Sequence, residues 1–201
     1  MKKGLMIVIS GPAGSGKGTV NARLLESQNF VYSVSATTRA PREGEVDGKN
    51  YYFITKEEFE ARIAEGQMLE HTSYCGNYYG TPLKEALGVL ESGKNLILEI
   101  EVEGALNVKR IYPEAVLIML LPPSFSVQET RLRGRGTETE DKILARLART
   151  KEELRVLSNY DYVVYNQDGG IDQCADDIRA IVRAEQCSMQ RHPTASDDYF
   201  A

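Results

Sequence analysis

The sequence contains few of the residues that bind transition metals. It has three cysteines and two histidines among 201 residues, and no two cysteines are close enough to form a CxxC pair. A zinc site is therefore not indicated, because such a site needs four clustered nitrogen or sulfur ligands. An odd number of widely separated cysteines is typical of free thiols in a reducing compartment. We therefore expect a cytoplasmic protein.

The sequence also lacks a long apolar run and an excess of basic residues. The apolar stretch 5–9 is too short for a signal peptide, and nothing approaches the ~20 apolar residues of a membrane span. The 29 acidic residues outnumber the 24 basic ones, which argues against non-specific binding of nucleic acid. A small anionic ligand is still compatible, since a few arginines suffice to bind it. We expect neither a membrane nor a nucleic-acid partner, and we leave a homo-oligomer open.

Five short apolar runs are typical of the buried strands of a parallel sheet. We expect these strands at residues 5–10, 31–35, 96–100, 115–121 and 162–165. Most of the segments between them carry apolar residues at helical spacing. We expect helices at residues 18–28, 83–92, 103–110, 127–133, 143–159 and 171–190. Strands that alternate with helices predict an α/β fold of three layers, in which helices cover a central parallel sheet.

Two segments interrupt this alternation. Residues 36–82 contain charged loops and short strand-like pieces, and Thr55 precedes Glu58 at the capping-box spacing that begins a helix. We interpret 36–82 as an inserted α+β subdomain, and 1–35 with 83–190 as the core. Residues 134–141 are charged and contain two glycines, which is typical of a mobile lid. The polar tail 191–201 is expected to be flexible.

A glycine-rich loop follows the first expected strand and precedes a helix. The loop consists of Gly11, Pro12, Ala13, Gly14, Ser15, Gly16, Lys17 and Gly18. Glycines let backbone N–H groups approach phosphate oxygens, while the helix N-terminus and Lys17 add positive charge. Such a pattern also arises by chance as a glycine-rich turn, but the flanking strand and helix favour a phosphate-binding P-loop. We therefore expect ATP to bind here.

One position departs from the usual form of this motif. Gly18 stands where a serine or threonine commonly binds magnesium, and Thr19 follows one residue later. Mg²⁺ is expected together with ATP, but its protein ligand is left open among Thr19, a carboxylate elsewhere, or none besides the phosphates and water. A dinucleotide-binding fold is disfavoured, because the glycine spacing does not give GxGxxG.

A pair of arginines suggests a second anion site. Arg39 and Arg42 follow the second expected strand, and Pro41 stiffens the turn between them. Two guanidinium groups that point the same way would bind a phosphate or a carboxylate in a bidentate manner. Taken alone, the pair is more typical of solvated loop arginines.

Weaker signals follow further along the chain. Tyr78 and Tyr79, between two glycines, are compatible with a ligand-binding wall or with a half-buried hairpin. Thr81 before Pro82 is typical of an ordinary helix N-cap. Three alternating glutamates follow the strand expected at 96–100, which is also the pattern of solvated charges at a strand end. They are Glu99, Glu101 and Glu103.

Together, these segments closely resemble the guanylate kinase family from Leu5 to about Ala184. The resemblance rests on the loop 11–18, on 34–42 followed by 44–51, on 76–81, and on the Arg-Gly-Arg-Gly-Thr-Glu segment 133–138. Blocks of this kind in one order are highly specific. The resemblance implies a P-loop fold with a GMP-binding subdomain at 36–82. It also implies transfer of the γ-phosphoryl group of ATP to GMP.

The resemblance implies roles for individual residues as well. The catalytic residues would be Lys17, Arg135 and Arg146. ATP would be bound by the loop 11–18, Thr19 and Asn166. The phosphate of GMP would be bound by Ser35, Arg39, Arg42, Tyr51 and Tyr79. Glu70 would accept hydrogen bonds from N1 and the 2-amino group of guanine, and Thr81 would donate one to O6. Glu99 and Glu101 would contact the base or magnesium-bound water, at a place where the family often has Asp and Gln for Glu101 and Glu103.

Two other interpretations are weaker. Adenylate kinase shares a P-loop of the Gly-Lys-Gly-Thr type, but Glu70 would then face the lone pair of adenine N1. Guanylate-kinase-like domains also occur as non-catalytic peptide-binding modules, which generally lack an intact phosphate-binding loop. Lys17 and its glycines are present here, which favours an ATP-dependent nucleoside monophosphate kinase.

Overall fold

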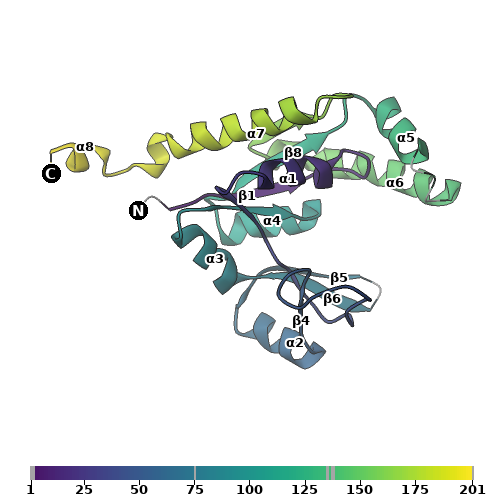
Figure 1. Cartoon of the computed structure of the whole chain (residues 1–201), viewed down its shortest axis with the longest axis horizontal. Helices are drawn as coiled ribbons and strands as arrows, with labels where there is room; N and C mark the ends of the chain where they lie inside the picture. Colours follow the sequence, from purple (N-terminus) through teal and green to yellow (C-terminus); the bar gives the residue numbers. More distant parts are fainter. Residues whose placement is uncertain (1–2, 75, 135, 137–138, 201) are drawn as a thin grey trace.

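The computed structural model describes residues 3–74, 76–134, 136 and 139–200. The chain forms a five-stranded sheet covered by helices and a smaller four-stranded sheet, which lies below the first in the view of Figure 1. Both ends of the chain belong to the part with the larger sheet.

The larger sheet contains a fully buried strand, β1 (Met6–Ser10), at its centre. The strand order is β2 (Phe30–Tyr32), β7 (Asn95–Glu99), β1, β8 (Val116–Leu121) and β9 (Tyr162–Tyr165). All neighbours are parallel. Ile7 and Ile9 pack on one face of the sheet, while Met6 and Val8 pack on the other. Because both faces are covered, the strand is apolar throughout. The expected α/β fold with a central parallel sheet is confirmed.

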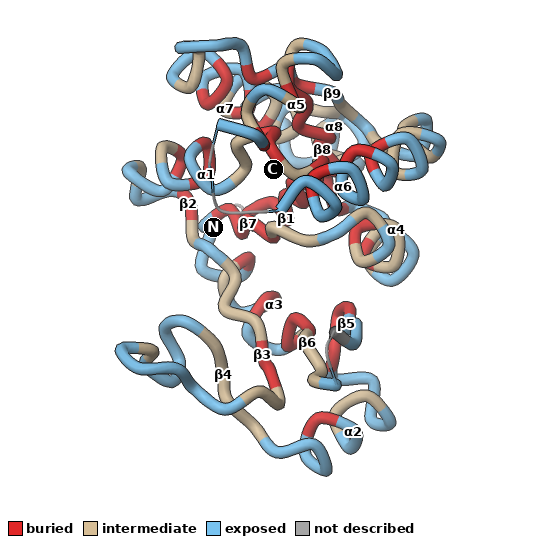
Figure 2. Tube along the Cα trace, turned by 90° about the vertical axis from the view of Figure 1, so that its right-hand side faces the viewer, coloured by how far each residue is buried: buried red, intermediate tan, exposed pale blue. Residues whose placement is uncertain are grey.

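Helices cover both faces of the larger sheet. One face is covered by α1 (Lys17–Leu25) and α7 (Ile171–Gln186), and the other by α3 (Leu83–Glu91) and α4 (Val102–Ile111). After β8 come α5 (Phe125–Gly134), α6 (Glu140–Glu153) and the 3₁₀ helix Leu154–Asn159. Figure 2 shows that buried residues concentrate in the central strands and on the helix faces turned toward them.

The smaller sheet lies within residues 36–82. Its order is β4 (Tyr52–Phe53), β3 (Ala36–Thr37), β6 (Asn77–Pro82) and β5 (Met68–Tyr74). β5 and β6 form an antiparallel hairpin, which agrees with the hairpin interpretation of Tyr78 and Tyr79. In α2 (Lys56–Ala64), the buried Phe59 stacks on Tyr78 at 5.2 Å between ring centres. The expected cap is present, because the Thr55 side chain accepts from the backbone N–H of Glu58 at 3.1 Å.

Several element boundaries differ from the expectations. The expected strand 31–35 is shorter than predicted: β2 ends at Tyr32, and residues 33–35 cross to the smaller sheet, where β3 begins at Ala36. The helix expected at 143–159 begins earlier, at Glu140, and ends at Glu153, where a 3₁₀ helix follows. Of the expected lid, residue 134 belongs to α5 and residues 140–141 to α6, while 135, 137 and 138 lie outside the described residues.

The C-terminal segment contains two short helices. The helix expected at 171–190 ends at Gln186, and the 3₁₀ helix Met189–Arg191 and the exposed α8 (Ala195–Phe200) follow it. Arg191 is fixed by an ion pair with Glu185 at 2.8 Å. Flexibility of the tail 191–201 stays a prediction. Among the described residues, no helix is long and apolar enough to cross a bilayer.

Candidate nucleotide-binding site

The glycine-rich loop lies between β1 and α1, at the carboxyl end of a strand of the parallel sheet. Gly16, just before α1, has a φ of 90°, a left-handed conformation that other residues rarely adopt. A Cβ atom on Gly16 would overlap the side-chain amide of Asn166, and one on Gly11 would overlap the carbonyl group of Leu120. Both ends of the loop therefore require glycine.

Lys17 is the first residue of α1, and its ammonium group reaches back to the loop. Nζ donates to the carbonyl oxygen of Gly11 at 2.5 Å and to that of Pro12 at 3.4 Å. No side chain among the described residues caps the first turn of α1, so none of them occupies its free N–H groups. A lysine beside the N-terminal end of a helix provides the positive surface that a triphosphate requires.

Residues from other segments hold the loop in place. Asn166, directly after β9, donates from Nδ2 to the carbonyl oxygen of Ser15 at 2.9 Å. Gln128 of α5 is buried and donates to the carbonyl oxygen of Ala13 at 2.9 Å. Arg131, also of α5, donates to the carbonyl oxygen of Asn166 at 2.8 Å. The contact expected between Asn166 and adenine stays a prediction, whereas its side chain visibly supports the P-loop.

The side chains around the loop bear on how magnesium is held. Gly18 and Thr19 are exposed on the first turn of α1. Ser15 is buried, and its hydroxyl oxygen has no hydrogen-bond partner among the described residues. In the part of the chain that the structure describes, no group of three or more Asp, Glu, His or Cys side chains could hold a metal ion. This donor set fits a magnesium ion that arrives with the phosphates of a nucleotide.

Arg39 and its neighbours form the centre of the second anion site. Its guanidinium carbon lies 5.5 Å from the ring centre of Tyr51 and 5.7 Å from that of Phe53. The Tyr51 ring lies 6.0 Å from the ring of Tyr79. Arg39 Nη2 pairs with Glu45 Oε1 at 2.8 Å, and only 15% and 18% of these side chains are exposed. Glu45 raises the pKa of Arg39, so the guanidinium group stays charged.

The other residues predicted for this anion site lie at its edges. The backbone N–H of Arg42 donates to the second oxygen of Glu45 at 2.6 Å, and Arg42 itself is exposed. Ser35 lies in the connection between the two sheets, where its carbonyl oxygen accepts from the backbone N–H of Tyr52 at 2.9 Å. The structure therefore brings one arginine and two tyrosines of the predicted set together, and it places these two residues beside them.

Glu70 and Thr81 form a buried polar pair in the smaller sheet. They lie opposite each other on β5 and β6, and the Thr81 hydroxyl donates to Glu70 Oε1 at 2.8 Å. Only 6% of Glu70 and 1% of Thr81 are exposed. Burial raises the pKa of Glu70, and hydrogen bonds from Thr81 oppose this shift. The N-cap interpretation of Thr81 is wrong, because α3 begins at Leu83 and Pro82 is its N-cap.

The glutamates after β7 have different surroundings. Glu99 accepts from Asn21 Nδ2 at 2.7 Å and from the Tyr32 hydroxyl at 3.3 Å, so its carboxylate is held between α1 and β2. Glu101 is exposed at the N-cap of α4 and pairs with Arg149 of α6 at 2.8 Å. Glu99 therefore joins elements of the core, while Glu101 connects α4 to α6.

Glu153 was not indicated by any sequence pattern. Arg149 bridges the two acids, because its Nε also pairs with Glu153 at 3.0 Å. Burial and then the charge of Glu101 raise the pKa of Glu153, while Arg149 and Lys17 lower it. The P-loop lysine therefore interacts electrostatically with the end of α6. Lys17 and Glu101 are far from Glu153 in the sequence, so no local pattern indicates that these charges influence one another.

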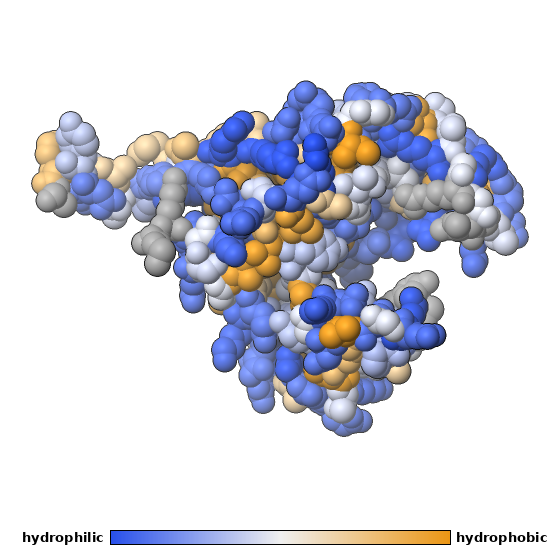
Figure 3. Space-filling model, viewed as in Figure 1, coloured by the Kyte–Doolittle hydropathy of each residue, from blue (hydrophilic) through white to orange (hydrophobic). Residues whose placement is uncertain are grey.

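The surface is hollowed between the two parts of the molecule (Figure 3). The space-filling view is hollowed between the region of α6 and the hairpin of β5 and β6 (Figure 3). Arg146, one of the predicted catalytic arginines, is exposed on α6. Arg135, the other, lies outside the described residues.

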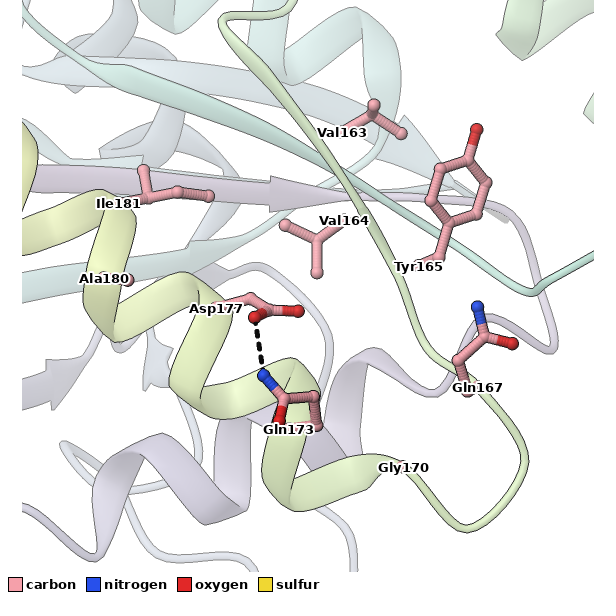
Figure 4. A pocket seen from close by; sticks show the side chains of 9 residues that line it. All are labelled: Val163, Val164, Tyr165, Gln167, Gly170, Gln173, Asp177, Ala180 and Ile181. Atoms are coloured by element: carbon pink, nitrogen blue, oxygen red, sulfur yellow. Dashed lines mark hydrogen bonds between the residues drawn. The ribbon is translucent and has the colours of Figure 1, made fainter.

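A separate hollow of about 370 Å³ lies between β9 and α7 (Figure 4). Val164 and Ile181 line it from the strand and the helix, and Gln173 donates to Asp177 at 2.9 Å beside them. None of the described residues that line it is a lysine or an arginine, so it offers no positive side chain to a phosphate. The P-loop and the smaller sheet are therefore the better candidates for nucleotide binding.

The chain is similar to proteins of one family over nearly its whole length. Residues 3–185 match the family model described as Guanylate kinase. The guanylate kinase of Halalkalibacterium halodurans is 52% identical over 191 residues, which cover 94% of this chain and 93% of that protein. That of Clostridium tetani is 48% identical over 191 residues, covering 95% and 91%. A crystal structure of guanylate kinase from Anaplasma phagocytophilum matches with a TM-score of 0.71 and 36% identity, covering 94% of this chain and 90% of that one.

Proposed function

This chain belongs to the guanylate kinase family, and from its site we propose that it transfers the γ-phosphoryl group of ATP to GMP, giving ADP and GDP. A P-loop with its lysine supports the ATP half of the proposal. The observation that carries the GMP half is the buried pair of Glu70 and Thr81.

The Glu70–Thr81 pair is complementary to guanine. Guanine has hydrogen-bond donors at N1 and N2 and an acceptor at O6, whereas adenine has an acceptor at N1 and a donor at N6. A carboxylate matches the two guanine donors, and a threonine hydroxyl matches O6. The Thr81 hydroxyl donates to Glu70, and it would have to turn toward O6 to donate to guanine. Adenine would leave the buried carboxylate opposite a lone pair.

The proposed reaction depends on neutralising charge more than on covalent chemistry. Lys17 and the N-terminus of α1 would bind the phosphates of ATP, which brings Mg²⁺ as part of the substrate. Arg39, Tyr51 and Tyr79 would bind the phosphate of GMP, with Ser35 and Arg42 at the edge. The acceptor phosphate is already ionised near neutral pH, so no general base is required. Arg135 and Arg146 would neutralise the charge that develops between the two nucleotides.

The two sheets would approach each other around the nucleotides. The smaller sheet is connected to the larger one by residues 33–35 and by the junction of β6 with α3. Closure of 36–82 and of the segment 134–141 would exclude water, which would otherwise hydrolyse ATP. We also infer a reducing, cytoplasmic location, since Cys174 and Cys187 are free thiols.

A coupled assay of ADP formation tests the proposed function. GMP, AMP, UMP and dTMP are offered in turn with ATP and Mg²⁺ to the purified chain. We expect turnover with GMP and at least about 100-fold lower kcat/KM with AMP, because a polar site rejects a base with the wrong hydrogen-bonding pattern. Faster turnover of AMP than of GMP would identify a different monophosphate kinase. No turnover of any of the four would support a non-catalytic binding module.

Glu45 offers a smaller, separate test of the phosphate site. Its two oxygens accept from Arg39 and from the backbone of Arg42, and the Glu45→Gln variant has one acceptor oxygen in place of two. We expect the KM for GMP to rise about 5-fold with little change in kcat, because an arginine that is no longer held must be ordered by the ligand. Steady-state kinetics at saturating ATP measure this. A lower KM would show instead that Glu45 competes with the phosphate for Arg39.

A further inference from the structure

The backbone conformation at Gly104 does not require a glycine. It is the third residue of α4 and is absent from the glycines with positive φ. Glycine is disfavoured in a helix relative to alanine, so a glycine in this place calls for a packing explanation. The explanation lies across the boundary between the two sheets, because α4 packs against β5.

The side chain opposite Gly104 is Glu70. A Cβ atom at Gly104 would lie 3.2 Å from Glu70 Oε2 and 3.4 Å from Cδ1 of Ile100. The first distance is shorter than an ordinary van der Waals contact and the second is at its lower limit, so the carboxylate would have to shift by a few tenths of an ångström. Its other oxygen is held by Thr81 at 2.8 Å, and the side chain is buried. Even a small shift of the carboxylate would therefore disturb its hydrogen bond with Thr81.

We propose that Gly104 is a specificity-determining residue of the guanine site, because its missing side chain leaves room for Glu70 Oε2 in the orientation that reads the base. The inference rests on the proposed function and adds a residue from the core to a site that otherwise lies in the smaller sheet. The first turn of α4 also places the positive end of a helix beside the carboxylate, which favours its ionised form. Gly104 acts through Glu70 and is a positioning residue.

The Gly104→Ala variant tests this inference, and Gly88→Ala is its matched control. Gly88 lies in α3, where an added Cβ atom would have no atom within 4 Å. Alanine favours helix at both positions, so neither variant is expected to melt earlier than the wild type. We expect Gly104→Ala to raise the KM for GMP about 10-fold, as when one charged hydrogen bond is weakened. The KM for ATP should not change, and Gly88→Ala should change neither constant.

A second variant background, Glu70→Asp, distinguishes an effect on the position of the Glu70 carboxylate from a general effect on the structure. Glu70→Asp shortens the carboxylate by one methylene group and removes the contact with residue 104. GMP affinity, measured by calorimetry without ATP, should then fall less than about 2-fold when Gly104→Ala is added to Glu70→Asp, because the two changes share one contact. The proposal would be overturned if Gly104→Ala reduced GMP affinity equally in the wild type and in Glu70→Asp. An unchanged KM for GMP or a raised KM for ATP in Gly104→Ala would also overturn it. If the wild type neither binds nor phosphorylates GMP, the proposed function fails instead.

Discussion

We expect the Lys17→Met variant to lose at least about 100-fold in kcat while it keeps its fold, as when a group that stabilises transition-state charge is removed. Lys17 begins α1, and its ammonium group lies at 2.5 Å from the carbonyl oxygen of Gly11. Methionine is a good helix former of similar length, so α1 should persist. The variant lacks only the charge that would accompany the phosphoryl group during transfer.

Steady-state assays with ATP and GMP measure this loss, and circular dichroism establishes that the variant is folded. Lys84→Met, an exposed lysine of α3, is the matched control and should keep its activity. A folded Lys17→Met protein with nearly normal kcat would show that the loop does not act as a phosphate-binding site. Loss of activity in both variants would point to a general effect of removing positive charge.

Local patterns predicted the P-loop well. The apolar run of β1, the glycines and the start of α1 are adjacent in sequence, so their order alone indicates the site. The groups that support the loop could not be predicted in this way. Gln128 and Asn166 reach it from α5 and from the end of β9, and only the order of the parallel strands brings these segments near the loop that follows β1.

The second half of the site depended more on the resemblance to a family than on local rules. Thr81 had the ordinary appearance of an N-cap, and its pairing with Glu70 depends on the register of the β5–β6 hairpin. That register shifts between Met68 and Glu70, an irregularity that no alternation of residues reveals. Gly104 gave one weak signal, a glycine near the start of a helix, whose meaning appears only when β5 packs against α4.

The Glu70→Gln variant should lose at least about 100-fold in kcat/KM for GMP, because two hydrogen bonds to a charged acceptor are affected. Glutamine keeps the shape and one oxygen, which can still accept from Thr81. Its amide group is a donor, however, and would face the donors of guanine. ATP binding, measured separately, should stay nearly unchanged because the P-loop lies in the other part of the molecule. Glu60→Gln, an exposed glutamate of α2, is the matched control.

The pH dependence makes the same prediction more specific. Burial raises the pKa of Glu70, and guanine requires the ionised form, so kcat/KM for GMP should fall as pH decreases through that raised pKa. Between the ordinary pKa of a glutamate and the raised pKa of Glu70, the native state holds a proton that the unfolded state has released. The contribution of Glu70 to the free energy of unfolding therefore decreases as pH rises through this window. At neutral pH the Glu70→Gln variant should therefore be no less stable than the wild type, although its kcat/KM for GMP is greatly reduced. A thermal melt at pH 7 and a pH–rate profile of each protein measure the two effects. Wild-type kcat/KM for GMP in the variant, with AMP still rejected, would show that another group reads the base.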